Sequence, residues 1–298
     1  MSFYNENGIN NYIKSNAVSG FSLYENSRSL LVVYNFIQQR PILVILDERY
    51  ENSGLIEKPD KYEKEVTTLA LGLANALDTK LLVIKYPDSY KTFDNSSHIW
   101  VWTSEKNVEL AFSENVYINE DGLYDTIKSL VGENNIRRFN NNKNPAKKEN
   151  DALSSAFHIW QRKNIEIGSY VDIDLVRFKD NKITELIELK RSNYSLDKWK
   201  PFDADKNNFS ILHYVADKMN VPLILVYNRR SDVLDEKIDK AFQFKTKKLK
   251  TNEDIYDVID KLKIFRINRD RNGGIVHNHL GECSLADFIS AANTTDLF

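Results

Sequence analysis

Acidic side chains and a lysine alternate along two neighbouring segments near the middle of this 298-residue chain. The stretch DIDLVRFKDNKITELIELKR holds Asp172 and Asp174, followed by Glu188 and Lys190 two residues apart. Burying charged groups is costly unless they are paired or bind something. The stretch is therefore either a solvated hairpin or a metal-dependent active site.

The spacing of these residues predicts that they lie close together. Residues 169–178 and 182–192 read as the two strands of a hairpin. Because side chains alternate across a strand, Glu188 and Lys190 share one face of the second strand. The turn between the strands then places Asp174 near Glu188.

Two carboxylates and a lysine at one point suggest a particular chemistry. Neighbouring carboxylates repel each other unless a cation lies between them. Mg²⁺ takes oxygen ligands, often one or two carboxylates together with a substrate phosphate. A lysine beside them could orient or activate a metal-bound water. We therefore expect metal-assisted hydrolysis of a phosphodiester, with Mg²⁺ as cofactor and Mn²⁺ as its substitute.

An acid on one strand followed by Glu-x-Lys on the next resembles the PD-(D/E)xK nuclease superfamily, which includes restriction endonucleases. The resemblance covers residues 149–229 and extends to the order helix, strand, strand, helix, strand. It implies that Asp174 and Glu188 bind the metal ion, assisted by the backbone carbonyl of Leu189. It also implies that Lys190 orients the attacking water. The proline of the family name has no counterpart here.

The resemblance carries three further expectations. Many members add a glutamate on the helix before the hairpin, and Glu149 is the candidate here. Asp172 is a second additional candidate, either as a ligand or as a partner of Lys190; the alternative is a solvent-near position at the start of the strand. The resemblance implies DNA as substrate, with RNA not excluded, and a homodimer, since cutting both strands takes two active sites.

Acid-x-Lys triplets are frequent in this chain, and others begin at Asp78, Asp180 and Asp235. Only the triplet that ends at Lys190 lies within an apolar strand and follows an acid on an adjacent strand. The alternative is a solvent-facing hairpin whose acids and lysine form cross-strand ion pairs. Aspartate is a poor strand former, so two within three residues favour a functional reason.

Aromatic and basic residues follow the motif in the segment RSNYSLDKWKP. Tyr194, Trp199 and Lys200 could stack on bases or track a phosphate backbone. The alternative is a lid that packs on the core. Arg229 and Arg230 are candidate phosphate contacts, although such charge runs are usually solvated.

The elements that position these residues follow an α/β pattern. We expect a restriction-endonuclease-like mixed sheet flanked by helices over 150–298. An asparagine-rich linker over 133–149 would separate it from an additional α/β domain over 1–132, whose role is sensing, dimerisation or target recognition. Within the nuclease domain, residues 253–262 read as a helix and 263–269 as a strand.

The two parts of the chain differ in charge. Residues 1–132 hold 12 basic and 18 acidic residues, a net of −6, and the remainder hold 29 and 25, a net of +4. A basic excess suits a polyanionic partner, because cationic side chains displace condensed counterions. Ordinary scatter explains so small an excess equally well.

Composition and the cysteine count bound the class of protein. The chain is 42% hydrophobic and 28% charged, which is usual for a globular protein. The single cysteine, Cys283, excludes an internal disulfide and suits a reducing compartment. We find no signal peptide and no apolar run of about 18 residues, so we expect a cytoplasmic protein without a membrane span.

Two other functions remain open on the sequence. One is a catalytically inactive protein of the same fold that binds nucleic acid or a partner. The other is a ligand sensor whose function lies in the N-terminal half, with the hairpin serving only the fold.

Overall fold

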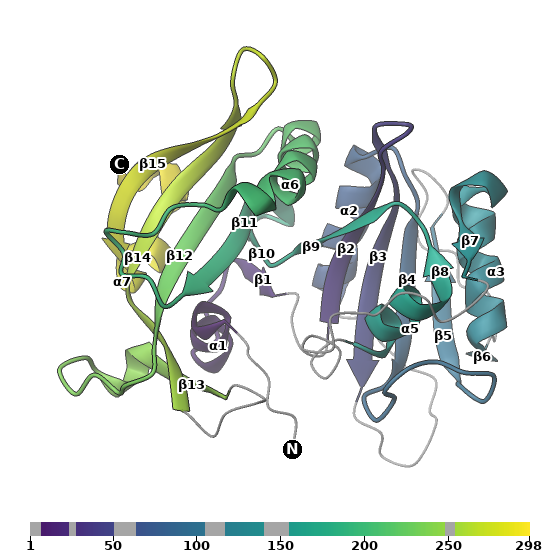
Figure 1. Cartoon of the computed structure of the whole chain (residues 1–298), viewed down its shortest axis with the longest axis horizontal. Helices are drawn as coiled ribbons and strands as arrows, with labels where there is room; N and C mark the ends of the chain where they lie inside the picture. Colours follow the sequence, from purple (N-terminus) through teal and green to yellow (C-terminus); the bar gives the residue numbers. More distant parts are fainter. Residues whose placement is uncertain (1–6, 24–27, 51–63, 105–116, 140–154, 248–253) are drawn as a thin grey trace. The chain divides into compact units, whose positions relative to one another are not determined.

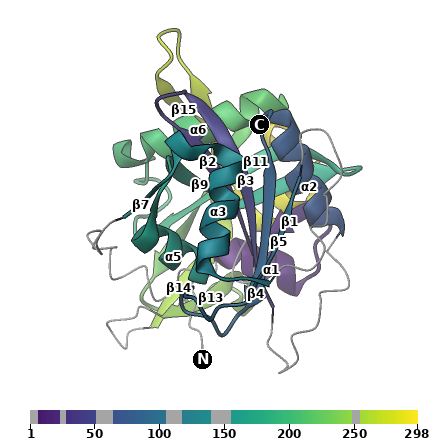
Figure 2. The ribbon, with the colours of Figure 1, turned by 90° about the vertical axis from the view of Figure 1, so that its right-hand side faces the viewer.

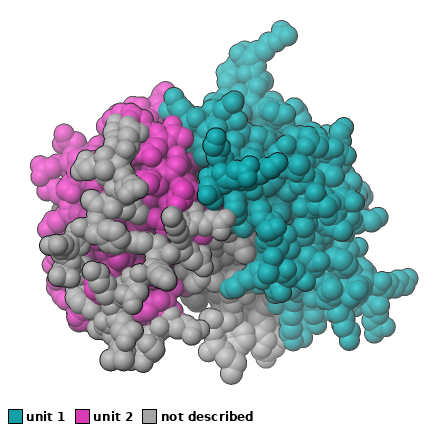
Figure 3. Space-filling model, turned by 180° about the vertical axis from the view of Figure 1, so that it is seen from behind, with its two compact units in different colours: residues 1–25, 173–298 teal, residues 26–172 magenta. Residues whose placement is uncertain are grey.

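The computed structural model describes residues 7–23, 28–50, 64–104, 117–139, 155–247 and 254–298 (Figure 1). Over these residues the chain is a mixed α/β protein with two mixed sheets and six α-helices. It divides into two compact units, shown in different colours in Figure 3. Unit 1 consists of residues 1–25 and 173–298, and unit 2 of residues 26–172. No helix among the described residues is long and apolar enough to cross a membrane.

This division differs from the expected boundary at 133–149. Residues 1–25 belong with the C-terminal part, so unit 1 is discontinuous in sequence. Helix α5 (Ala156–Asn164), which we expected in the nuclease domain, belongs to unit 2. Its buried Phe157 and Trp160 are part of the core of that unit. A polar, asparagine-rich composition marks a loop, whereas the apolar contacts of the following helix decide which core it joins.

Unit 2 is built on a six-stranded sheet in the order β6-β5-β4-β3-β2-β9. The strands are β2 (Arg28–Asn35), β3 (Arg40–Tyr50), β4 (Leu81–Pro87), β5 (Ile99–Thr103), β6 (Tyr117–Ile118) and β9 (Ser169–Ile173). Strands β3 and β4 are parallel and are joined through helix α2 (Lys64–Ala76). Both strands read as continuous apolar runs, as expected where both faces of a sheet are covered.

The helices of unit 2 cover its sheet from two sides. Helices α3 (Glu120–Val131) and α5 lie in front of the strands in Figure 2 and share one apolar cluster with them. Helix α2 packs against β3 and β4 and contributes nothing to that cluster, so it covers the other face. A short two-stranded sheet of β7 (Arg137–Arg138) and β8 (Ile165–Glu166) and the turn η1 (Glu133–Asn135) complete the unit.

Unit 1 is built on a seven-stranded sheet in the order β1-β10-β11-β12-β14-β13, with β15 also paired to β14. The strands are β1 (Phe21–Leu23), β10 (Leu175–Lys179), β11 (Lys182–Ser192), β12 (Leu223–Ser231), β13 (Gln243–Lys247), β14 (Asp254–Arg269) and β15 (Ile275–Ser284). Strand β11 is parallel to β12 and antiparallel to β10. The predicted helix over 253–262 is wrong, because residues 254–262 form the first part of β14.

Three helices pack on the sheet of unit 1. They are α1 (Gly8–Ser15), α6 (Lys206–Met219) and α7 (Leu285–Ser290), with short turns η2 (Asp203–Asp205), η3 (Lys240–Phe242) and η4 (Thr294–Leu297). Ile9 of α1 and Phe288 of α7 share an apolar cluster with Ile187 and Leu189 of β11. Helix α6 connects β11 to its parallel neighbour β12, as a parallel pair requires.

The predicted hairpin is present, but its first strand is shorter than expected. Strands β10 and β11 pair antiparallel around Asp180 and Asn181, which both have positive φ values, as a tight hairpin turn requires. The segment 169–178 is not one strand, because it breaks at Asp174. Strand β9 before the break pairs in the sheet of unit 2, and β10 after it pairs in the sheet of unit 1.

A buried ion pair ties the C-terminal residues to this hairpin. Nε of Arg177 donates to Oε2 of Glu185 at 2.8 Å, and both side chains are buried. Glu185 also accepts a hydrogen bond from the backbone N–H of Thr294 at 2.6 Å. Arg177 donates to the carbonyl oxygens of Phe288 at 2.9 Å and Ala291 at 2.7 Å. The pair thus compensates its own charges and holds the segment after β15 in place.

Replacing Glu185 tests this ion pair. We expect Glu185→Ala to lower the free energy of unfolding by about 3–5 kcal/mol, because it leaves the Arg177 guanidinium buried without its carboxylate. Chemical denaturation measures the loss. The matched control is Glu282→Ala on β15, an exposed position where we expect a change within about 0.5 kcal/mol. Equal effects of the two variants would contradict the assignment.

The core of unit 2 contains a carboxylate, that of Asp47, which is only 1% exposed. Burial raises its pKa, and the nearby His158, Ser155 and Tyr86 offset this only in part. An acid whose pKa is higher in the folded state binds protons more tightly there than in the unfolded chain. Its contribution to stability is therefore favourable at low pH and is lost as the pH rises from the unfolded pKa, about 4, through the folded pKa.

Asp47→Asn should remove this pH dependence. We expect the variant to be more stable than the wild type at pH 7 by on the order of 1 kcal/mol, because the amide carries no charge to desolvate. The difference should shrink towards pH 3, where the wild-type carboxyl is protonated. Denaturant unfolding at a series of pH values measures both effects. Asp88→Asn, at an exposed position, is the control, and an equal gain there would refute the explanation.

Candidate active site

The sheet of unit 1 brings together Asp174, Glu188 and Lys190. Asp174 immediately precedes β10, while Glu188 and Lys190 lie on one face of β11. Nζ of Lys190 is 2.9 Å from Oε1 of Glu188. The charge of Asp174 also acts on this ammonium group. The three residues are therefore neighbours, and their catalytic role stays a prediction.

The position of Asp174 follows from where β10 ends. The ladder between β10 and β11 stops at Leu175, which lies opposite Ile187. One step further along β11, the backbone N–H of Leu189 donates to Oδ2 of Asp174 at 2.8 Å. A side-chain oxygen thus takes the place of the backbone acceptor that a longer strand would supply. The end of the strand fixes the carboxylate beside β11.

A third acid approaches the lysine from the other side. Oδ2 of Asp205, in the turn η2, is 3.7 Å from Nζ of Lys190. The ring of Phe209 on α6 lies 5.8 Å from the same ammonium group. Asp205 was not among the predicted site residues, although its place at the start of the helix after the motif strand is a sequence signal. Lys190 is therefore enclosed by acids from three separate segments.

This environment decides the protonation state of Lys190. Burial by itself lowers the pKa of a lysine, but the carboxylates of Glu188, Asp174 and Asp205 more than offset it and hold the pKa of Lys190 well above its usual value. The side chain stays an ammonium ion throughout the neutral range. It can donate hydrogen bonds and balance negative charge, but it cannot accept a proton from water there.

The remaining predicted metal ligands have different outcomes. The side chain of Leu189 is buried in the core of unit 1, and its N–H is the group that holds Asp174. Asp172 belongs to unit 2, where its Oδ1 lies 3.8 Å from Nε2 of His158. Glu149 lies outside the described residues. The ligand roles of these residues stay predictions.

The aromatic and basic segment after β11 separates into core and surface residues. Trp199 is only 1% exposed, and its ring stacks on Tyr227 with 4.1 Å between centroids. The expectation that Trp199 stacks on a base is therefore wrong, because its faces are already covered. Tyr194 is 56% exposed, and Lys200 is exposed as well. These two remain available at the surface.

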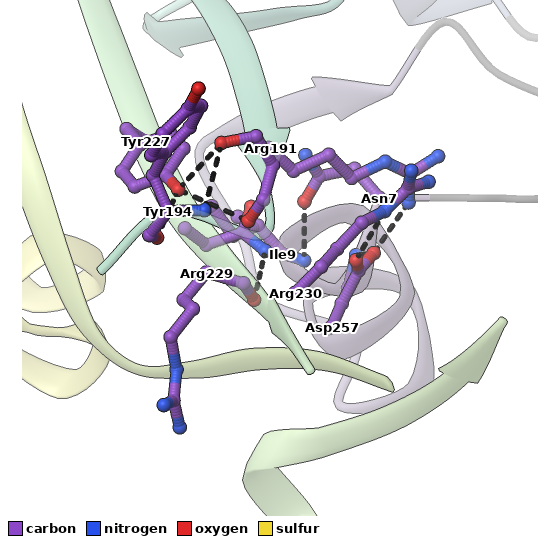
Figure 4. Close-up of polar contacts among 11 residues, drawn as sticks. Asn7, Ile9, Arg191, Tyr194, Tyr227, Arg229, Arg230 and Asp257 are labelled. Carbon is purple, nitrogen blue, oxygen red and sulfur yellow. Dashed lines mark hydrogen bonds and ion pairs between the residues drawn. The ribbon is translucent and has the colours of Figure 1, made fainter. Parts of the chain in front are cut away.

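The two arginines of β12 point in different directions, as Figure 4 shows. Nε of Arg230 lies 3.3 Å from Oδ1 of the buried Asp257, and Arg191 forms an ion pair with the same carboxylate. Arg230 thus balances a buried charge, which explains its place without a phosphate. Arg229 extends away from this cluster, and its Nη2 lies 3.9 Å from Oδ2 of Asp235.

Asp174 and Glu188 can bind a hard cation only if water or substrate supplies further ligands. Among the described residues, no group of three or more His, Cys, Asp or Glu side chains is arranged to hold a metal ion. Asp174 and Glu188 offer carboxylate oxygens, which suit Mg²⁺ when water and phosphate supply the other ligands. The pair therefore fits a metal ion that binds together with substrate.

Comparisons of the chain with protein-family models, curated proteins and solved structures find no match. The likeness to PD-(D/E)xK nucleases stays a prediction from the motif residues.

The cluster predicts how Lys190 affects metal binding. We expect Lys190→Ala to bind Mn²⁺ about tenfold more tightly than the wild type, because it removes a cation from beside the carboxylates. Calorimetric titration and the shift of the melting temperature with added Mn²⁺ measure the change. Glu188→Gln should lose binding, and Lys182→Ala, at the exposed hairpin turn, should match the wild type. Unchanged affinity in Lys190→Ala would contradict competition between the lysine and the metal.

Proposed function

We propose that unit 1 is a metal-dependent endonuclease that hydrolyses phosphodiester bonds in DNA. The observation that carries this proposal is the convergence of Asp174, Glu188 and Lys190 beside the end of β10, with 2.9 Å between Lys190 and Glu188. Like charges gathered in a partly buried place favour a functional reason over a structural one. The resemblance of these residues to the PD-(D/E)xK pattern supplies that reason.

The order of elements in unit 1 supports the proposal. Helix α1 and strands β1, β10 and β11 are followed by α6 and β12. Removing unit 2 from the chain thus leaves helix, strand, strand, strand, helix, strand. The expected motif strands, following helix and parallel strand are present in unit 1. The helix expected before them, over 149–163, belongs to unit 2, and α1 and the additional strand β1 precede β10 instead.

Each residue has a role that follows from its surroundings. Asp174 and Glu188 would hold Mg²⁺, which when bound polarises the phosphoryl oxygen and lowers the pKa of a water molecule. Lys190 stays protonated, so it donates a hydrogen bond to the attacking water or to a phosphate oxygen. It also offsets the negative charge that grows on the phosphate in the transition state. Asp205 orients Lys190 without contacting the substrate.

The proposal includes the substrate, the oligomeric state and the cellular compartment. DNA rather than RNA follows from the resemblance alone. A homodimer would bring two such sites to a duplex, one for each strand. A reducing cytoplasm suits a chain whose one cysteine, Cys283, is free.

Plasmid cleavage tests the proposal. We expect the wild type to nick or linearise supercoiled DNA with Mg²⁺ or Mn²⁺, and Lys190→Ala to lose about 100-fold or more of the rate, because a donor to the reacting phosphate is removed. Lys182→Ala is the matched control, since it removes the lysine of another acid-x-Lys triplet, one at an exposed turn. Gel analysis of the products measures the rates.

The same experiment separates the alternatives. A folded protein that binds DNA but cleaves neither plasmid, single-stranded nor branched DNA would contradict the proposal and favour an inactive binding protein. Equal cleavage by wild type and Lys190→Ala would place the chemistry elsewhere in the chain. Ligand binding in unit 2 without DNA binding would favour a sensor.

A further inference from the structure

We infer that the segment from Tyr194 to Asp205 is a rigid platform on which unpaired DNA bases stack, so that the preferred substrate has a single-stranded part. This inference rests on the proposed function for the identity of the polymer. It concerns two side chains, the rings of Tyr194 and Phe202. The second of these was not among the expected nucleic-acid contacts.

Two aromatic rings lie exposed side by side on this segment. Tyr194 is 56% exposed and Phe202 is 46% exposed. Their ring centroids are 6.5 Å apart and their planes are tilted by 57°, so they are two neighbouring aromatic faces. The buried ring of Trp199 supports Phe202 from below, with 6.1 Å between centroids and an angle of 86°. Exposed rings held in this way offer flat apolar surface, which every base can use for stacking.

The backbone beneath the rings is held by buried polar groups. Nζ of Lys263, a buried residue of β14, donates to the carbonyl oxygens of Leu196 at 2.7 Å and Trp199 at 3.1 Å. The hydroxyl of Tyr227 lies within hydrogen-bond distance of the carbonyl oxygen of Tyr194, as Figure 4 shows. Charged donors to backbone carbonyls are strong and keep the segment in one conformation. A preorganised surface loses little entropy when a ligand binds.

One end of the platform lies at the candidate catalytic lysine, because Oδ2 of Asp205 is 3.7 Å from Nζ of Lys190. Tyr194, at the other end, follows Lys190 by four residues along the chain. Duplex DNA does not present base faces in this way, because its bases stack on one another. The occupant is thus a single strand or an unpaired end.

The segment from Tyr194 to Asp205 carries Lys198 and Lys200 against Asp197, Asp203 and Asp205, a net charge of −1. Lys198 and Lys200 are exposed between the two rings in sequence. The carboxylate of Asp203 is paired with Lys206 at 2.9 Å. Cationic groups interleaved with aromatic rings are the usual composition of surfaces that bind single strands.

A binding experiment without cleavage tests this inference. A single-stranded oligonucleotide carrying 2-aminopurine is titrated with the full chain in EDTA, so that no hydrolysis takes place. We expect quenching of the fluorescence and tighter binding than for the matching duplex. The double variant of Tyr194→Ala and Phe202→Ala should lose the quenching and bind about 100-fold more weakly. Tyr194→Phe should behave as the wild type, because the ring remains.

Controls keep the result interpretable. Val233→Ala removes another exposed apolar side chain of unit 1 and should leave binding unchanged. Circular dichroism and the melting temperature establish that the variants are folded. Quenching and affinity equal to those of the wild type in the double variant would overturn the inference, as would equal affinity of the wild type for single strand and duplex.

The binding experiment can fail or succeed independently of the nuclease proposal. Lys190→Ala should keep the quenching while it loses cleavage. Stacking by a wild type that cleaves nothing would refute the nuclease and keep the platform. Cleavage by a wild type whose binding does not depend on the rings would keep the nuclease and refute the platform.

Discussion

The hydrogen bond from the backbone N–H of Leu189 to Asp174, 2.8 Å long, is the interaction on which the candidate site depends. It places the carboxylate of Asp174 beside β11 at the point where the pairing of β10 with β11 ends. The side chain of Leu189 points to the opposite face, where it is packed in the apolar core. One residue of β11 is therefore fixed from both faces. Because the N–H cannot move, the carboxylate that it holds stays beside Glu188 and Lys190.

The charge balance around Lys190 determines which ligands the candidate site favours. Lys190 faces three carboxylates, so the cluster without a metal ion already carries an excess of negative charge. A divalent cation relieves that excess better than one ammonium group does. The buried pair of Arg177 and Glu185 on the same hairpin is balanced within the protein, with backbone groups of the C-terminal segment as further partners. The hairpin thus carries two ionic clusters, of which that of Arg177 and Glu185 is neutral within the protein and that of Lys190 has an excess of acids.

The sequence predicted the local features and missed the long-range ones. The hairpin turn at Asp180 and the face shared by Glu188 and Lys190 follow from strand alternation and turn chemistry, which act over a few residues. Residues 253–262 have apolar side chains at helical spacing, yet strand pairing with β12, β13 and β15 overrides that periodicity. No local pattern reveals that β1 pairs with β10, since about 150 residues separate them.

Unit 2 is inserted between two adjacent strands of unit 1, and Asp174 stands at the point of return. Strand β1 pairs with β10, with Phe21 opposite Arg177, so the chain leaves and re-enters unit 1 on adjacent strands. Asp174 is the single residue between β9, in the sheet of unit 2, and β10, in the sheet of unit 1. Its carboxylate is held by the backbone N–H of Leu189, within unit 1. Glu188 and Lys190 lie within a paired strand, so of the three site residues Asp174 is the one that stands next to unit 2 in the sequence.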